Sequence, residues 1–435
     1  MLLIFSLLFY AWGEPVWVFL LVFICVIDYF GAFFIERQTR RVTRKWILLL
    51  LIILNLLPLF MFKYFNFLID NINMRFGADL DAFPFLMPIG ISFFTFQAIS
   101  YLVDVYREKV HAQRNLLYIV LYIAMFPQLM AGPIIRYSDI AKQITQRDEG
   151  IQRFSRGMFR FCIGLGKKVI LANYAGNTAT ALLDGQLNNL SVQGAWIGLL
   201  MFFFQIYFDF SGYSDMAIGL GRIFGFDYKE NFRYPYTARS VTEFWRRWHI
   251  SLSSFFRDYV YIPMGGNRKH QYLNILIVWA LTGLWHGAAW NFILWGLYYA
   301  LLLVIEKKLR SAGLDISKIP VISNIVLLLI VLLGWGLFYY TDITELGMFY
   351  QHTLGIGNVP FKLSIRELSA VGSILWLIPV MVIGVTSFPT RVVNSLFEGG
   401  NLRRGIRLIW STALLVSCFL LILGQSYNPF LYFRF

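Results

Sequence analysis

Uncharged, apolar runs about 20 residues long recur along this sequence, and runs of that length can cross a bilayer as helices. Hydrophobic residues make up 58% of the 435 residues and charged residues only 14%, against about 45–50% and about 25% in soluble domains. The clearest runs are Ala82–Val103, Leu116–Ile135, Gly185–Phe208, Ile319–Thr341, Leu368–Thr390 and Leu408–Phe433. Three weaker candidates are Val16–Ile35, which contains Asp28, Trp46–Phe62, which is short, and Phe161–Leu183, which contains Lys167 and Lys168.

Such a chain cannot fold as a soluble core alone, because the apolar segments far exceed what a soluble interior buries. We predict an all-α, polytopic integral membrane protein with roughly ten to twelve transmembrane or re-entrant helices. Length alone would suggest two or three soluble domains, but the apolar runs continue throughout. We therefore expect a single membrane-embedded domain over residues 1–435.

The loops between the runs predict the orientation in the membrane. Arg37–Lys45 holds five basic residues and no acid, and Arg403–Arg407 is a second basic cluster, so both should be cytoplasmic. Asp70–Asp81 carries three acids and one arginine, and Gly176–Ser191 is nearly uncharged, so both suit the outside. The net charge of +14 is thus mainly a topology signal rather than a sign of nucleic-acid binding, although it could also attract an anionic cytosolic donor.

Cysteine and histidine spacing argues against a disulfide framework or a metal site. Cys25, Cys162 and Cys418 lie far apart in apolar stretches, which is typical of buried structural thiols. The five histidines show neither HxxxH nor HExxH spacing. The sequence also lacks a GxSxG nucleophile elbow, a P-loop and a GxGxxG fingerprint, which disfavours serine hydrolases and nucleotide-binding enzymes.

The segment Arg222–Lys269 is neither an ordinary loop nor an ordinary span. It has nine Lys or Arg against four Asp or Glu, yet it is rich in aromatic residues. Apolar positions in SVTEFWRRWHISLSSFFRDYVYIP recur in steps of three and four, which predicts one amphipathic helix over residues 240–263. Arg246, Arg247 and Arg257 would then face headgroups or a wet cavity. The helix could anchor at the interface, or it could carry a reactive group into the membrane.

A histidine stands in the middle of the apolar run His270–Ile305, within the sequence GLWHGAAWNFILWG. The run is 36 residues long, about 54 Å as a helix, which is too long for one span and slightly short for two. Gly283 and Gly287 permit a break or close helix packing. If the run forms two antiparallel pieces, His286 lies near their junction, whereas in one tilted span it lies inside the bilayer.

His286 and His249 are the candidate catalytic groups, because an ionisable residue in a membrane segment is costly unless it is used or well bonded. Either could instead be a structural histidine. Asp209 and Asp215 could relay protons or pair with Arg222 and helix ends. The residues therefore allow a membrane enzyme with a histidine base, or a transporter whose path includes Asp209, Asp215 and His286. No internal repeat is visible, which favours the enzyme. The remaining histidines lie in polar surroundings and indicate surface positions: His111, His270 and His352.

Three long segments closely resemble motifs of the membrane-bound O-acyltransferase family: YFDFSGYSDMAIGLGRIFGF, EFWRRWHISLSSFFRDYVYIPMGGNR and GLWHGAAWNFILWG. FPQLMAGPIIRY and the terminal NPFLYFRF are similar to its bacterial alginate O-acetyltransferase branch. The resemblance is dense over about residues 126–306 and looser elsewhere. Members of that branch usually begin with a further apolar helix before a motif like LLFYAW, so we expect a first span to be absent here or to lie upstream.

The resemblance implies a ring of helices around a thinned central funnel in the bacterial cytoplasmic (inner) membrane. It implies transfer of an acetyl group from a cytosolic thioester such as acetyl-CoA, with no bound cofactor or metal. Extracytoplasmic acetyltransferase partner proteins would then place the group on a cell-surface polysaccharide such as alginate. The alternative is D-alanyl transfer from a carrier-protein thioester in teichoic acid modification.

The resemblance also implies roles for individual residues. His286, in the WHG motif, would be the general base, and His249, in the WRRWH motif, would orient the acceptor or stabilise an oxyanion. Trp285 and Asn291 would shape the pocket. Two further roles come from residue chemistry and spacing: Ser253, one helical turn after His249, could hydrogen-bond to it, and Arg246 could bind donor phosphates.

Overall fold

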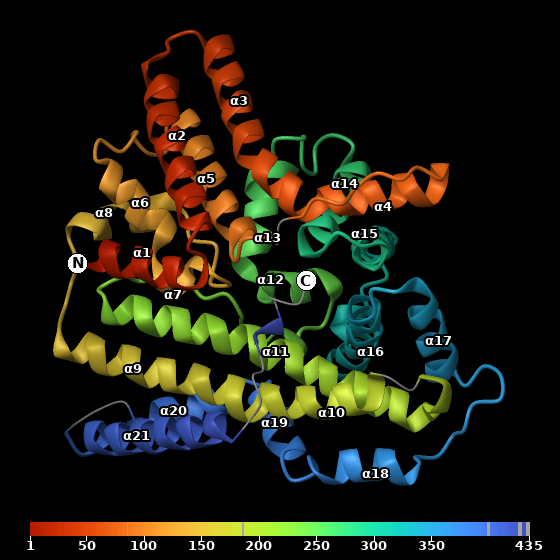
Figure 1. Cartoon of the computed structure of the whole chain (residues 1–435). Coiled ribbons are helices and arrows are strands. Elements are labelled where there is room, and N and C mark those ends of the chain that lie inside the picture. The colour runs from red at the N-terminus through yellow and green to blue at the C-terminus, as the bar shows by residue number, and fades with distance from the viewer. Residues whose placement is uncertain (85, 185–186, 398–400, 425–428, 432–435) are drawn as a thin grey trace. The chain divides into compact units, whose positions relative to one another are not determined.

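All regular secondary structure in the described part of the chain is helical (Figure 1). The computed structural model describes residues 1–84, 86–184, 187–397, 401–424 and 429–431, and these contain no β-strand. Five described helices are long and apolar enough to cross a membrane: Trp17–Arg37, Arg41–Phe76, Val192–Ile223, Pro320–Tyr339 and Gly405–Leu423. The prediction of an all-α, polytopic membrane protein is confirmed, while the ring around a central funnel stays a prediction.

The chain divides into two compact units, each described here by itself. Unit 1 comprises residues 1–157, 220–229 and 257–260, and unit 2 comprises residues 158–219, 230–256 and 261–435. That the whole chain acts as a single domain stays a prediction.

Unit 1 is built around a helical hairpin and one almost fully buried helix. The hairpin pairs α2 with α3, and the basic segment Arg37–Lys45 forms its tip. Asp28 in α2 is tolerated because its Oδ1 accepts a hydrogen bond of 2.8 Å from Asn55 Nδ2 in α3. The helices of this unit are α1 (Leu2–Gly13), α2 (Trp17–Arg37), α3 (Arg41–Leu59), α4 (Phe65–Phe76), the buried α5 (Ile91–Tyr106), α6 (Leu116–Ala124), α7 (Phe126–Leu129) and α8 (Tyr137–Thr145).

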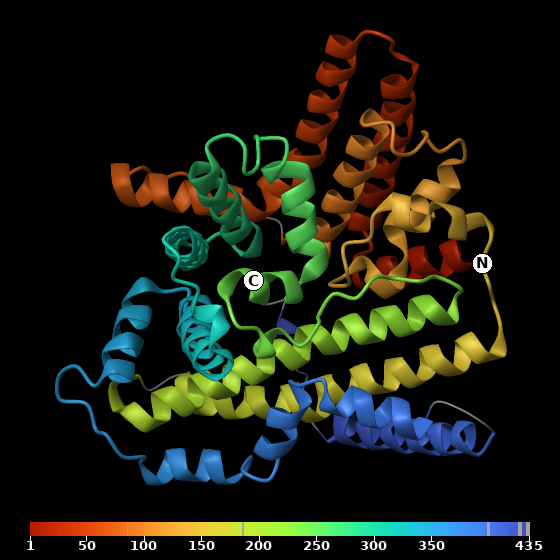
Figure 2. The same ribbon diagram turned by 180° about the vertical axis from the view of Figure 1, so that it is seen from behind.

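Unit 2 contains most of the long helix α11, which lies alongside α9 and α10 in both views (Figures 1 and 2). The first residues of α9, up to Gly157, and the last residues of α11, from Leu220, belong to unit 1. A Cβ atom at Gly164 would lie 2.5 Å from the Gly212 carbonyl oxygen, so these helices touch backbone to backbone. The helices here are α9 (Ile151–Gly166), α10 (Asn173–Leu183), α11 (Val192–Ile223), α12 (Val241–Arg247), α13 (Ile250–Phe256), α14 (Gln271–His286), α15 (Trp290–Ser311), α16 (Pro320–Tyr339), α17 (Ile343–Leu354), α18 (Ile365–Gly372), α19 (Ile378–Gly384), α20 (Phe388–Phe397) and α21 (Asn401–Leu423).

Several expected spans differ from the structure because breaks interrupt them. Leu116–Ile135 is broken at Met125 into α6 and α7, and Leu368–Thr390 is divided among α18, α19 and the start of α20. Prolines occupy the first turns of α7 and α19, where the missing N–H is not needed, so the chain starts a new helix there. Ile319–Thr341 corresponds closely to α16.

Other boundaries shift by larger amounts. The run Gly185–Phe208 enters α11 only at Val192, and α11 continues to Ile223. The expected outer loop Asp70–Asp81 is helical as far as Phe76, where Gly77 ends α4 in the left-handed conformation. The expected run Leu408–Phe433 and the terminal motif NPFLYFRF lie partly outside the described residues.

Candidate active site

His286 is the last residue of α14, at the tip of a tight helical hairpin. Gly287–Ala289 form the connection to α15, so the apolar run His270–Ile305 is two antiparallel pieces rather than one tilted span. A Cβ atom at Gly283 would lie 2.2 Å from the Phe292 carbonyl oxygen, and one at Gly296 would lie 2.3 Å from the Trp279 carbonyl oxygen. The two helices can approach this closely only because both positions are glycine.

Aromatic rings surround the His286 imidazole. Its ring centroid lies 4.9 Å from that of Trp285, 5.0 Å from that of Trp295 and 5.1 Å from that of Phe338 in α16. Trp335, one turn earlier in α16, stacks on Trp295 at 6.2 Å. Only 9% of His286 is exposed, so water reaches it through a narrow opening at most. A buried imidazole among aromatic rings is costly to maintain, so this position suits a residue that reacts with a substrate entering the same space.

His249 lies at a break between two short helices. The predicted continuous helix over residues 240–263 is wrong, because α12 ends at Arg247 and α13 begins at Ile250. His249 has φ of 42°, a left-handed conformation that is strained for most residues other than glycine. Such strain persists only where the surroundings hold the residue in place, and it is often found at functional sites.

Asn231 stabilises the break between α12 and α13. Its carbonyl oxygen accepts a hydrogen bond of 2.9 Å from the Ile250 amide, and its Oδ1 accepts one of 3.0 Å from the Ser251 amide. Its Nδ2 donates to Ser214 Oγ in α11 at 3.2 Å. Asn231 therefore caps the first turn of α13 and ties it to α11, which fixes the position of His249.

A single indole contacts both histidines. The Trp285 ring centroid lies 6.0 Å from that of His249 and 4.9 Å from that of His286. The structure thus brings together the histidines of two motifs that are 37 positions apart in the sequence (286 minus 249). Convergence of the two predicted catalytic groups beside one aromatic ring is the central feature of this site.

Burial makes His249 a neutral group. The side chain is 3% exposed, and its desolvation lowers its pKa from 6.5 to about 4, against a smaller opposing effect of a backbone hydrogen bond. At neutral pH His249 is therefore an uncharged imidazole, which can donate or accept a hydrogen bond. With so low a pKa it is a weak base, so the geometry suits an orienting role better than proton abstraction.

The predicted hydrogen bond between Ser253 and His249 is made by the backbone, because the Ser253 amide donates to the His249 carbonyl oxygen at 3.0 Å. Ser253 Oγ donates to the Trp248 carbonyl oxygen at 3.4 Å, while Ser251 Oγ lies 3.5 Å from His249 Nδ1. The one-turn spacing therefore holds for the backbone of α13, whereas the hydroxyl group that approaches His249 Nδ1 belongs to Ser251. Asn291 is fully buried, and its Nδ2 donates to the Leu337 carbonyl oxygen at 3.2 Å, so it joins α15 to α16 beside the His286 wall.

Arg246 lines a basic cavity of about 730 Å³. Arg247 pairs with Glu243, and Arg310 with Glu306, whereas Arg239 and Arg246 form no ion pair with a carboxylate in the described part of the chain. The full lining is Thr237, Arg239, Ser240, Thr242, Glu243, Arg246, Arg247, Arg310 and Ser317. Guanidinium and hydroxyl groups around a cavity are suited to a phosphate-bearing ligand.

An aromatic cluster connects this cavity to His286. Trp245, next to Arg246 in α12, has its ring centroid 5.5 Å from that of Trp295, which in turn contacts His286 at 5.0 Å. Tyr299 packs against both tryptophans, at 4.8 Å and 5.2 Å. Trp295 belongs to the WHG-containing motif and could have been singled out from it, whereas nothing in the sequence marked Trp335, Phe338 or Asn231.

The intramembrane aspartates are paired with cations. Asp215 forms ion pairs with Arg160 at 2.8 Å and Lys167 at 2.7 Å, and Asp209 pairs with Lys168 at 2.5 Å. Lys167 and Lys168 lie inside the continuous helical segment from α9 to α10, not at an edge, and are tolerated because of these pairs. The arrangement favours a structural role for both aspartates over a proton path.

The cysteines and one histidine outside the site can also be compared with their predicted surroundings. All three cysteines are free and buried, as the sequence predicts for structural thiols. His111 is fully exposed at its side chain and pairs with Glu36, which fits a surface residue. Among the described residues, no group of three or more His, Cys, Asp or Glu could hold a metal ion.

The sequence profile of the membrane-bound O-acyltransferase family matches residues 5–350. The chain belongs to this family. It is 36% identical over 467 aligned residues to a probable alginate O-acetylase of Pseudomonas putida, covering 100% of this chain and 94% of that protein. It is 31% identical to the peptidoglycan O-acetyltransferase of Helicobacter pylori, covering 99% of this chain and 90% of that protein. The protein is therefore a membrane O-acyltransferase.

A more distant relative is named for the alternative reaction, D-alanyl transfer. The teichoic acid D-alanyltransferase of Bacillus subtilis is 28% identical, over 58% of this chain and 66% of its own length. The similarity to the O-acetylating relatives is both higher and more complete.

Proposed function

We propose that this O-acyltransferase takes an acetyl group from a cytosolic thioester, acetyl-CoA, and passes it across the bacterial cytoplasmic membrane. The final acceptor is a cell-surface polysaccharide such as alginate, reached through an extracytoplasmic acetyltransferase partner. The proposal is supported by the similarity to O-acetylating relatives over nearly the whole chain. The observation that carries it is the convergence of His286 and His249 on Trp285.

His286 acts as the general base in this proposal. It removes the proton from an acceptor hydroxyl as that oxygen attacks the thioester carbonyl carbon. The tetrahedral intermediate then collapses, the carbon–sulfur bond breaks, and the leaving thiolate takes the proton back from His286. The products are an acetyl ester and a free thiol, so the histidine ends the cycle unchanged.

His249 is the neutral partner of this base. Its low pKa keeps it uncharged, so it can donate one hydrogen bond to the developing oxyanion without competing for the proton. The left-handed backbone at His249 and the contacts of Asn231 hold it in place before substrate arrives. Ser251 Oγ, near Nδ1, can influence which ring nitrogen carries the hydrogen.

The arginine cavity binds the donor. Arg246 and Arg239 are available for phosphates, and the Trp245–Trp295 contact leads from that cavity to His286. Trp285, Trp295 and Asn291 form and brace the walls of the reaction space. This arrangement requires no bound metal or cofactor.

The test uses purified protein in nanodiscs with acetyl-CoA labelled in the acetyl group. Slow release of label to water, or transfer to an added acceptor, is the expected result. Consumption of a D-alanyl carrier-protein thioester but not of acetyl-CoA would replace acetyl transfer by D-alanyl transfer. If neither thioester reacts and the protein moves a solute across liposomes, the acyltransferase proposal is wrong and the transporter alternative holds.

A further inference from the structure

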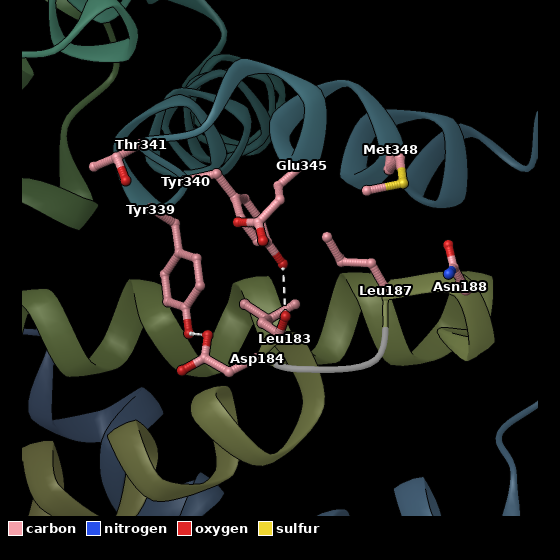
Figure 3. Close-up of a pocket in the computed structure, with 9 residues that line it drawn as sticks. All are labelled: Leu183, Asp184, Leu187, Asn188, Tyr339, Tyr340, Thr341, Glu345 and Met348. Carbon is pink, nitrogen blue, oxygen red and sulfur yellow. Dashed lines mark hydrogen bonds between the residues drawn. The ribbon is translucent and has the colours of Figure 1, made fainter. Parts of the chain in front are cut away.

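A second cavity, of about 410 Å³, lies where α10, α16 and α17 meet (Figure 3). This volume is in the range of small-ligand pockets. Its lining residues all belong to unit 2: Leu183, Asp184, Leu187, Asn188, Tyr339, Tyr340, Thr341, Glu345 and Met348. The cavity has no part in the site described above.

The cavity is acidic. Asp184 and Glu345 are exposed carboxylates in its lining, and no Lys, Arg or His is among the lining residues. Within the described ranges, neither carboxylate forms an ion pair. Two cation-forming side chains bond nearby carbonyl groups, Arg366 that of Ala181 and His352 that of Leu190, but neither lines the cavity.

The aromatic part of the lining is held in place. Tyr339 Oη donates to Asp184 Oδ1 at 2.5 Å, and Tyr340 Oη donates to the Leu183 carbonyl oxygen at 3.0 Å, as the dashed lines in Figure 3 show. Tyr339 also packs edge-on against Phe202, with ring centroids 4.8 Å apart. Because both tyrosine hydroxyls already donate hydrogen bonds, the cavity offers a ligand the ring faces, the remaining carboxylate oxygens and the polar side chains of Asn188 and Thr341.

The acidic cavity and the arginine cavity lie at opposite ends of α16. This helix has 20 residues and is about 30 Å long, the thickness of a bilayer core. Arg310 and Ser317 of the arginine cavity precede it, and Tyr339 and Tyr340 end it. Positive charge in short loops marks the cytoplasmic side, so we expect the start of α16, which follows Arg310, to be cytoplasmic and the acidic cavity to be extracytoplasmic.

The cavity is also close to the reaction space. Phe338, which contacts the His286 ring at 5.1 Å, is the residue before Tyr339. A ligand that contacts Tyr339 and Tyr340 therefore lies at the end of α16, the helix whose Phe338 contacts His286.

We propose that this cavity receives a lysine or arginine side chain of the extracytoplasmic partner protein that accepts the acetyl group. Two carboxylates beside aromatic rings are complementary to an ammonium or guanidinium group. A polyuronate such as alginate is itself anionic and would be repelled, so the cavity favours a protein over that polysaccharide. This inference rests on the proposed function, which supplies the need for an outer partner.

The experiment measures binding of a fluorescent arginine-containing peptide by anisotropy, with the protein in nanodiscs of neutral lipid. The double variant Asp184→Asn, Glu345→Gln should weaken binding about tenfold, because it removes both carboxylate charges that would pair with the arginine. Asp184→Asn keeps an oxygen that can accept the Tyr339 hydrogen bond, so the fold should survive. The matched control, Asp79→Asn with Asp81→Asn, removes two exposed acids elsewhere and should bind like the parent.

Two comparison ligands decide the outcome. A peptide with citrulline in place of arginine should fail to bind, because it keeps the shape but lacks the charge. If a neutral oligosaccharide binds instead, with the same dependence on the carboxylates, the cavity is a glycan site and the proposal is wrong. Equal peptide binding by both double variants, or no binding by the parent, would also overturn it.

Acetyl-CoA hydrolysis is measured on the same samples. The cavity variant should hydrolyse acetyl-CoA as fast as the parent, since the cavity does not touch the reacting atoms. Failure of the parent to hydrolyse or transfer acetyl groups would count against the proposed function. Normal hydrolysis without carboxylate-dependent binding of the peptide would count against the docking site alone.

Discussion

Replacing His286 by glutamine separates a catalytic histidine from a structural one. Glutamine keeps hydrogen-bonding capacity in a site that is only 9% exposed, but it cannot cycle a proton between the acceptor and the thiolate. Loss of a positioned general base typically lowers the rate by about 10²–10⁴-fold, which corresponds to about 2.7–5.4 kcal/mol of activation free energy. We expect His286→Gln to lose turnover by that factor and to retain its melting temperature.

The alanine variant provides the second comparison. His286→Ala also removes ring contacts with Trp295 and Phe338, so it should combine the same loss of turnover with some loss of stability. If His286 were only a structural group, alanine should destabilise the protein by about 1–3 kcal/mol and glutamine should largely restore it.

Both variants are measured beside the parent for turnover of labelled acetyl-CoA and for thermal stability in the same detergent. His111→Gln, at a fully exposed side chain, is the control for a histidine change without catalytic effect. A His286→Gln protein with near-normal turnover would refute the assignment of the base, whatever the family resemblance.

Three further results are expected. Because the pKa of His249 is lowered to about 4, the unfolded chain binds the proton more strongly, so the parent should lose stability as the pH falls from 6.5 towards 4. His249→Gln should remove part of that loss and retain more turnover than His286→Gln; an unchanged pH profile of unfolding would contradict the buried neutral imidazole. Asn231→Ala should lower turnover and stability together by releasing the first turn of α13, whereas Ser253→Ala should be close to the parent in both assays. Single cysteines placed in Arg37–Lys45 or Arg403–Arg407 should escape labelling from outside intact cells, and labelling of either would reverse the predicted orientation.

Local patterns in the sequence were sufficient for the membrane class and for most of the hydrophobic helices. The agreement is closest where one uninterrupted apolar run makes one helix, as in α2 and α16. A run fails as a predictor where a proline starts a new helix, as in α7 and α19, because hydropathy averages over the break. His286 and His249 could also be selected from the sequence, since a histidine among apolar residues stands out and both lie in motifs of the family.

Only the tertiary structure decided how those histidines are held. The left-handed residue at His249 interrupts the periodicity from which one helix was predicted, and it exchanges Ser253 for Ser251 as the neighbouring hydroxyl. Phe338 and Asn231 act on the site from positions 52 residues after His286 and 18 residues before His249 (338 minus 286, 249 minus 231). Periodicity and composition describe what a segment prefers by itself, whereas these contacts exist only because packing brings distant segments together. The physical reason is that burial, which sets the pKa of His249 and the surroundings of His286, belongs to the packed helices and not to any one segment.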